Sequence, residues 1–120
     1  MHELSLAMSI VDLVEREAAK AWASKIRSLE LEIGSLAGIE IDSLLTSLQM
    51  VMERTALQDV RVDISRVKPK ATCEHCGSVF EPRSLYTPCP VCGSYESFLV
   101  NGREFRLKSI EIENMENEQL

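Results

Sequence analysis

Two Cys-x-x-Cys pairs, Cys73/Cys76 and Cys89/Cys92, constrain this chain more than any other feature of its sequence. Twelve residues separate the two pairs, which contain every cysteine of the chain. Each pair can form a short turn that directs two sulfurs at one point, and the glycines at positions 77 and 93 permit the left-handed backbone needed just after it. Four converging thiolates make a tetrahedral Zn(II) site, so the spacing predicts a structural zinc module of the ribbon or knuckle type.

Other uses of four cysteines fit the sequence less well. Two disulfides would need an oxidising compartment, and no secretory signal peptide is recognisable at the start of the chain. An iron–sulfur cluster is usually bound with a different spacing, and a redox Cys-x-x-Cys needs only one pair at a strand-to-helix junction. Four sulfurs close the coordination shell of zinc, so we expect no chemistry at this metal, and we expect His75 to be a solvated turn residue rather than a ligand.

The charge of the chain bears on the commonest alternative for a zinc ribbon. The formal net charge is −6 over 120 residues. Binding to a phosphate backbone needs clustered Lys and Arg, so a nucleic-acid-binding protein is disfavoured and no nucleic acid is expected as a partner. No apolar run approaches the ~20 residues of a membrane span. We therefore expect a globular, cytoplasmic protein with no membrane span.

Two stretches with helical periodicity precede the cysteines. The first begins at Leu4, and its predicted buried stripe comprises Leu4, Ala7, Met8, Val11, Val14, Ala18, Ala21 and Trp22. Met8 and Trp22 are interpreted as ordinary core residues. The second helix is expected from Ile41 to about Thr55. Both helices should cover a sheet with one apolar face.

Strands are expected where apolar and polar residues alternate, at 29–33, 60–64, 98–100 and 103 to about 113. Asn101-Gly102 predicts a turn between the last two. Within the last strand the apolar positions change from odd to even numbers, which predicts a bulge near Lys108-Ser109. The expected fold is α/β: two helices packed on a small mixed, roughly three-stranded sheet, with an inserted zinc-ribbon-like module. Residues 1–67 and 103–120 would form the α/β domain, and residues 68–102 the zinc module.

The amino terminus offers a second candidate metal site. The Met1 amine and the His2 amide nitrogen close a five-membered ring on a metal, and the same amide with the His2 imidazole closes a six-membered ring. Amide nitrogens ionise for Cu(II) or Ni(II), which favour square-planar nitrogen fields. On this chemistry alone the alternative stays open that His2 is an exposed terminal residue with no metal.

The chain resembles the HypA/HybF family of hydrogenase maturation proteins, which are nickel metallochaperones. The resemblance covers nearly the full length and rests on MHELSLAMSIVDLV, on LEIGSLAGIE, on CEHC and CPVC each followed by GS, and on FRLKSIEIEN. It implies that His2 binds nickel, helped by the Met1 amine and by backbone amides that include that of Glu3. It also implies structural Zn(II) at Cys73, Cys76, Cys89 and Cys92, and partnership with the nickel-handling GTPase HypB and the [NiFe]-hydrogenase large subunit.

The resulting hypothesis is a metal carrier rather than an enzyme. Ni(II) would be transferred cargo bound by the α/β domain, and the protein would be a monomer or weak homodimer. The Glu3 carboxylate could contact a partner or the metal, or simply complement the helix dipole. Some family members carry histidines beside both knuckles, but only His75 is present here, so a second nickel contact is not expected. The alternative is a zinc-ribbon adaptor or a nucleic-acid-binding protein with no nickel role.

Overall fold

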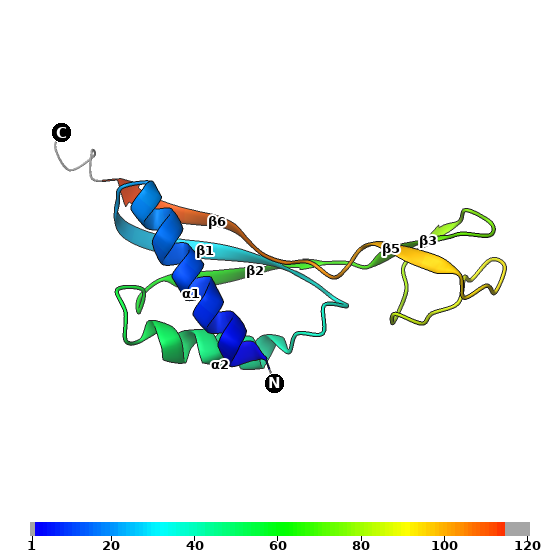
Figure 1. Cartoon of the computed structure of the whole chain (residues 1–120), viewed down its shortest axis with the longest axis horizontal. Coiled ribbons are helices and arrows are strands. Elements are labelled where there is room, and N and C mark those ends of the chain that lie inside the picture. The colour runs from blue at the N-terminus through cyan, green and yellow to red at the C-terminus, as the bar shows by residue number, and fades with distance from the viewer. Residues whose placement is uncertain (1, 115–120) are drawn as a thin grey trace. The chain divides into compact units, whose positions relative to one another are not determined.

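The structure is a computed structural model that describes residues 2–114, in which two helices are followed by most of the strands (Figure 1). In chain order they are α1 (Glu3–Lys20), β1 (Ala23–Gly34), α2 (Ile41–Met52), β2 (Arg61–Val67), β3 (Lys70–Cys73), β4 (Val79–Phe80), β5 (Ser97–Asn101) and β6 (Phe105–Asn114). One sheet has the order β2-β1-β6 and a second has the order β4-β3-β5. The predicted α/β class, two helices with small mixed sheets and a four-cysteine module, is confirmed. Within the described residues, neither helix is both long and apolar enough to cross a membrane.

The chain divides into two compact units. The first contains the residues up to 31, residues 39–64 and the residues from 107 on, and the second contains residues 32–38 and 65–106. Both helices therefore belong to the first unit, and β3, β4, β5 and all four cysteines belong to the second. Which metal each unit binds stays a prediction at this point.

The face that α1 buries differs from the predicted stripe. Its buried residues are Glu3, Ala7, Ile10, Val11, Val14 and Ala18, and the helix contacts α2. Leu4, Met8 and Trp22 were expected in the core, but they are 51%, 57% and 75% exposed, so that prediction is wrong. Ala7 and Ala18 have small side chains, which leave room for close helix packing. The buried face of α1 therefore lies beside the predicted stripe. Trp22 lies beyond the end of α1 with a φ of 58°, so the helical period does not extend to it.

The core of the first sheet lies on its central strand, β1. Leu29 and Leu31 are at most 1% exposed and alternate with Glu30, as the sequence predicts. On α2, Leu44 and Leu48 are equally buried. Full burial of each such side chain contributes about 1.5–3 kcal/mol, so this layer supplies much of the stability of the helical unit.

The exposure pattern of β6 changes phase where the sequence predicts a bulge or bend. The Lys108 ammonium lies 3.8 Å from the Glu30 carboxylate, and the Ser28 hydroxyl donates to the Glu111 carboxylate at 3.2 Å. The step from the first contact to the second is two residues on β1 but three on β6. Lys108 and Ser109 are both exposed, whereas strict alternation would bury one of them. The change of phase is present, and the bulge itself stays a prediction.

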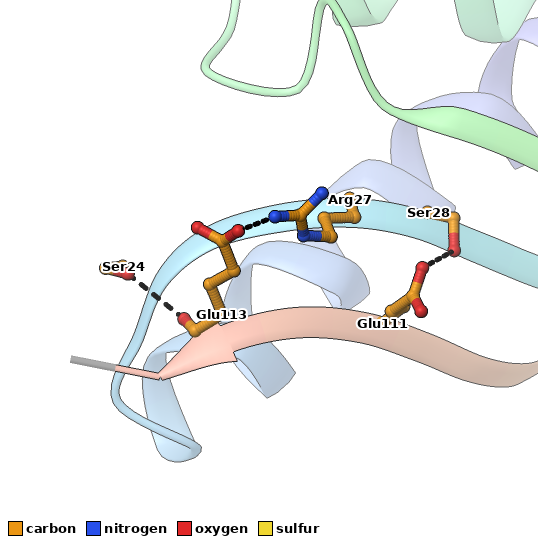
Figure 2. A network of polar contacts seen from close by, with 5 residues as sticks. All are labelled: Ser24, Arg27, Ser28, Glu111 and Glu113. Carbon is orange, nitrogen blue, oxygen red and sulfur yellow. Dashed lines mark hydrogen bonds and ion pairs between the residues drawn. The ribbon is translucent and has the colours of Figure 1, made fainter. Parts of the chain in front are cut away.

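Polar contacts hold the end of β6 to β1. Figure 2 shows the Arg27 guanidinium paired with the Glu113 carboxylate, and the Ser24 hydroxyl, which donates to the Glu113 carbonyl at 3.1 Å. Such surface pairs contribute only about 0–1 kcal/mol each. These pairs hold β6 in register with β1, whereas the buried apolar area comes from β1.

The second unit contains two strands that were not predicted, β3 and β4. β3 pairs antiparallel with both β4 and β5. The predicted turn at Asn101-Gly102 is present as a bend, but it joins strands of two different sheets and closes no hairpin. At this crossing the Leu36 amide donates to the Gly102 carbonyl at 2.7 Å, and the Gly34 amide donates to the Glu104 carbonyl at 2.8 Å.

Candidate metal centre

Four cysteine sulfurs meet at one point of the second unit. Cys73 is the last residue of β3, and Cys76 follows in the turn that leads to β4. Cys89 and Cys92 lie in the loop before β5. All four sulfurs lie within 4.8 Å of one another, and Cys73 and Cys89 are buried while the other two are exposed. The structure thus brings together the four residues that the spacing selected.

The two cysteine pairs share one backbone conformation. In each, the glycine after the pair donates its amide to the carbonyl of the first cysteine, and the first cysteine donates its own amide to the next serine carbonyl. The bonds are Gly77 to Cys73 at 3.0 Å, Cys73 to Ser78 at 2.9 Å, Gly93 to Cys89 at 2.8 Å and Cys89 to Ser94 at 2.8 Å. Both glycines have positive φ, 74° and 77°, which L side chains rarely adopt. The local sequence therefore shapes each knuckle.

The distances between the sulfurs suit a single tetrahedral metal. The sulfurs of Cys73 and Cys92 are 3.6 Å apart, as are those of Cys76 and Cys89. Sulfurs at ~2.3 Å from a tetrahedral zinc are separated by about 3.8 Å, whereas a disulfide joins sulfurs at ~2.05 Å. All four cysteines are free thiols, so the disulfide alternative is not what the structure contains. Four soft sulfur donors at this separation fit Zn(II).

The protonation of the cluster also favours a cation. Hydrogen bonds from the Ser78 hydroxyl, whose oxygen is 3.1 Å from the sulfur, and from the Ser78 amide lower the pKa of Cys76 to about 6. The Ser94 amide acts in the same direction on Cys92, but its neighbouring sulfurs, Cys73 first, together with burial raise the pKa of Cys92 to about 12. Thiolates packed this closely resist a further negative charge unless a cation neutralises them.

His75 stands apart from the cluster. Its Nε2 lies 3.1 Å from the Glu96 carboxylate, and its side chain is 58% exposed. The prediction that it is a solvated turn residue is confirmed. The imidazole is directed to a carboxylate rather than to the sulfurs.

The second candidate site lies at the start of α1, in the first unit. Met1 lies outside the described residues. His2 is exposed and occupies the position before the helix, where its carbonyl accepts the Leu6 amide at 3.0 Å. Glu3, the first residue of α1, is only 8% exposed. The imidazole of His2 is therefore exposed to solvent, whereas the side chain of Glu3 is buried.

The Glu3 carboxylate joins the two helices of the first unit. It accepts the Glu40 amide at 3.3 Å, just before α2, and the Glu40 carboxylate in turn accepts the Asp42 amide at 3.2 Å. Contact with the α-ammonium group of the chain, followed by the amides of Glu3 and Glu40, lowers the pKa of Glu3 to about 2. Sequence reasoning missed Glu40, because no local pattern connects residues that lie 37 positions apart.

Comparison with known proteins gives a consistent family. Residues 1–112 match the family described as "Hydrogenase/urease nickel incorporation, metallochaperone, hypA". The hydrogenase maturation factor HypA of Parabacteroides distasonis is 42% identical over 112 residues, which are 93% of this chain and 97% of that protein. The factor of the same name from Prosthecochloris aestuarii is 36% identical over 94% of this chain and all of its own length.

Solved structures agree in fold. The solution structure of the Ni metallochaperone HypA from Helicobacter pylori matches with a TM-score of 0.69 and 29% identity, covering 95% of this chain and 99% of that chain. A second solution structure of a HypA protein matches with a TM-score of 0.69 and 31% identity over 93% of this chain and 96% of that one.

Proposed function

The chain belongs to the HypA family of hydrogenase/urease nickel-incorporation metallochaperones, and from that premise we propose that it carries Ni(II) bound at its amino terminus. The recipient would be the large subunit of a [NiFe]-hydrogenase, reached in partnership with the nickel-handling GTPase HypB. The family description also includes urease, so a second recipient of the same metal is compatible with it. The work would take place in the cytoplasm, where thiols stay reduced.

The observation that carries the nickel proposal is the exposed His2 at the start of a chain whose first residues fall within the family match. The donors would be the Met1 amine, the amide and imidazole nitrogens of His2, and the Glu3 amide. Nitrogen donors in this arrangement suit square-planar Ni(II). A site at a chain end is open to a partner, which suits a protein that must release its metal.

Glu3 has a positioning role in this proposal. Its carboxylate accepts the Glu40 amide beside its contact with the α-ammonium group, so it links the first turn of α1 to the start of α2. The His2 imidazole then projects from an anchored helix rather than from a loose tail. The sequence left open whether this carboxylate touches the metal or stabilises the helix, and the hydrogen bond favours the second.

The resident metal would be Zn(II), held by Cys73, Cys76, Cys89 and Cys92. When bound, it would supply a structural crosslink between the two knuckles, since four thiolates leave no open coordination position. A closed site offers nothing to a substrate. We therefore propose a carrier with no catalytic activity.

Calorimetric titration of the zinc-loaded, untagged protein with Ni(II) tests the proposal. His2→Ala removes the imidazole and should abolish specific Ni(II) binding while zinc content and unfolding temperature stay unchanged. His75→Ala is the matched control, because it deletes the other histidine of the chain and should leave nickel affinity intact. Equal nickel affinity in His2→Ala and the parent protein would mean that the metal is bound elsewhere, whereas no specific nickel binding by the parent protein would favour the zinc-only adaptor.

A further inference from the structure

Charged residues are distributed unevenly between the two units of the chain. The first unit has fourteen Asp and Glu against seven Lys and Arg, whereas the smaller second unit has five against six. Nearly half of the cationic side chains of an acidic protein therefore belong to the unit that contains the cysteines. Cations gathered in one part of an acidic chain make the local potential positive, which favours an anionic partner there.

Four of these cations gather where the chain crosses between the sheets. They are the exposed side chains of Arg66, Lys68, Lys70 and Arg103, which we call the basic cluster. From residue 66 to residue 70 exposed and half-buried residues alternate, as they do along an extended chain, so the first three cations lie on one side. A Cβ built on Gly102 would lie 2.8 Å from the Pro69 Cα atom, so Arg103, the next residue, lies beside the same stretch.

The basic cluster has no carboxylate partner: none of its side chains forms an ion pair with any residue from 2 to 114. Arg106 of the same unit, by contrast, pairs with Glu32. The Glu104 carboxylate is adjacent in the sequence, but it accepts a backbone amide at 2.8 Å. The zinc site, which is net negative with four thiolates, begins at Cys73, at the opposite end of β3 from Lys70. An anionic ligand would therefore relieve the repulsion among these cations.

A hollow of about 400 Å³ lies beside the basic cluster. Its walls include Lys68, Lys70, Val79, Phe80, Glu81 and Asn101. Val79 is exposed and Phe80 is half-buried, so the hollow offers apolar surface next to two ammonium groups. β4 lies at the edge of its sheet with β3 as its neighbour, so an extended segment of another chain can lie along it.

The register of this sheet indicates the pattern of such a segment. Phe80 is paired with Ala71, so the two side chains share one face of the sheet. Lys70 precedes Ala71 in β3 and is exposed, so it lies on the other face. A segment along β4 that alternates acidic and apolar residues would direct its carboxylates to Lys70 and its apolar side chains to Phe80.

Asn101 gives an independent indication of the ligand. Its side-chain oxygen is buried and accepts no hydrogen bond in the part of the chain that the structure describes. A buried acceptor without a donor is costly, and in a native protein it calls for an explanation. A backbone N–H of a bound peptide would supply the donor, whereas a phosphodiester backbone has no proton to offer. The hollow therefore fits a peptide better than a nucleic acid.

We propose that the hollow and the basic cluster bind an extended acidic segment of a partner protein, in which carboxylates alternate with apolar side chains. The carboxylates pair with the basic cluster, an apolar side chain lies against Phe80, and a backbone N–H donates to the Asn101 side chain. From residue 66 to residue 70 an extended chain covers about 13 Å, so about five residues of the segment are sufficient. The binding uses the second unit alone and does not depend on nickel.

Fluorescence anisotropy with the full-length, zinc-loaded protein tests this proposal. The probe is a labelled peptide of about six residues that alternates Glu and Leu, and the matched probe has Gln in place of every Glu. Protein is titrated from about 1 μM to about 1 mM, the range of weak peptide binding. The Glu peptide should bind, and its affinity should fall about tenfold in about 0.5 M salt, because salt screens exposed charges. The Gln peptide should bind about tenfold more weakly or not at all.

Charge reversals locate the binding site. Lys68→Glu and Lys70→Glu each replace an attraction by a repulsion, so each should weaken binding of the Glu peptide about tenfold or more. Arg54→Glu is the matched control, because it makes the same change in net charge at an exposed cation of the first unit, and it should leave the affinity unchanged. Zinc content and circular dichroism check that each variant is folded.

Two further variants test the walls of the hollow. Glu81→Gln removes the carboxylate from the walls and should tighten binding about threefold, whereas Glu53→Gln, the same charge change in the first unit, should not. Asn101→Leu deletes the unpaired acceptor and should weaken binding. Its unfolding temperature should not fall, because this oxygen has no partner to lose in the free protein.

Three results would overturn the proposal. Equal affinity for the Glu and Gln peptides, or no binding up to about 1 mM, would exclude an acidic segment as the ligand. Full binding by both Lys68→Glu and Lys70→Glu would place the peptide elsewhere. Tighter binding of a labelled oligonucleotide or of phosphatidylserine vesicles than of the Glu peptide would identify a nucleic acid or a membrane surface as the occupant instead.

Discussion

Gly34 is the position where a single added methyl group has the least room. A Cβ built there would lie 2.1 Å from the Gly102 carbonyl oxygen, which is backbone and cannot swing aside as a side chain can. The amides of Gly34, Ser35 and Leu36 donate to the carbonyls of Glu104, Val67 and Gly102 where the chain crosses between sheets. A side chain at this position would therefore disturb several bonds at once.

Gly34→Ala should destabilise the protein by about 3 kcal/mol or more, the upper range for inserted volume in a packed region. Gly38→Ala is the control, because no heavy atom lies within 4 Å of its added methyl group and only the positive φ of 76° carries a cost of about 1 kcal/mol. Urea unfolding of both variants measures the difference. Equal stability of the two would show that the crossing relaxes easily.

At the scale of elements, substitutions in α1 test which of its residues belong to the core. Ile10 is 5% exposed and Met8 is 57% exposed, although the sequence periodicity favoured Met8 for the core. Ile10→Ala should therefore lower the unfolding free energy by about 2–5 kcal/mol, whereas Met8→Lys should change it by no more than about 0.5 kcal/mol. Thermal and urea denaturation would contradict the assignment if Met8→Lys proved as damaging as Ile10→Ala.

The elements differ in how far the sequence predicts them. Long periodic stretches such as α1, α2 and β6 are predictable, and the change of exposed positions at Lys108-Ser109 follows from the shift in apolar positions. β3 and β4 have only four and two residues, too few for any alternation to show. The buried face of α1 depends on how closely α2 packs against it. The helical periodicity of the sequence carries no information on this tertiary contact.

The features of the candidate site also differ in how far the sequence predicts them. Cys-x-x-Cys spacing is local, so the convergence of Cys73, Cys76, Cys89 and Cys92 could be predicted. The partner of His75, Glu96, and the link between Glu3 and Glu40 arise from pairing across the fold. Neither contact leaves a trace in the local sequence pattern.

Loss of one cysteine ligand should affect the zinc unit alone. Structural zinc contributes ~10–16 kcal/mol in small modules at neutral pH, so Cys73→Ala should lower zinc content and abolish slow amide exchange in β3, β4 and β5. The helical unit has its own core and should keep its circular dichroism. Val91→Ala, inside the second pair but 71% exposed, is the control that should retain zinc. Disappearance of the helical signal in Cys73→Ala would show that the two units do not fold separately.

At the scale of the whole molecule, the proposed metal sites belong to different units and have opposite character. The zinc site is built from paired knuckles with buried sulfurs, which suits permanent retention. The proposed nickel site uses backbone and amine nitrogens at the chain end, next to an exposed imidazole. Its donors must lose protons to bind metal, so nickel affinity should fall steeply as pH is lowered from about 8 to about 6.

The most direct test of the nickel site uses the free amine. Calorimetric titration with Ni(II) would compare the untagged protein, a form extended by a few residues before Met1, and a form extended after Leu120. We expect the amino-terminal extension to weaken nickel binding nearly as much as His2→Ala, because it removes the amine and breaks the five-membered chelate ring. The carboxy-terminal extension should leave binding unchanged. Full nickel affinity in the amino-terminally extended protein would contradict the account, since the metal would then be bound by side chains without the terminal amine.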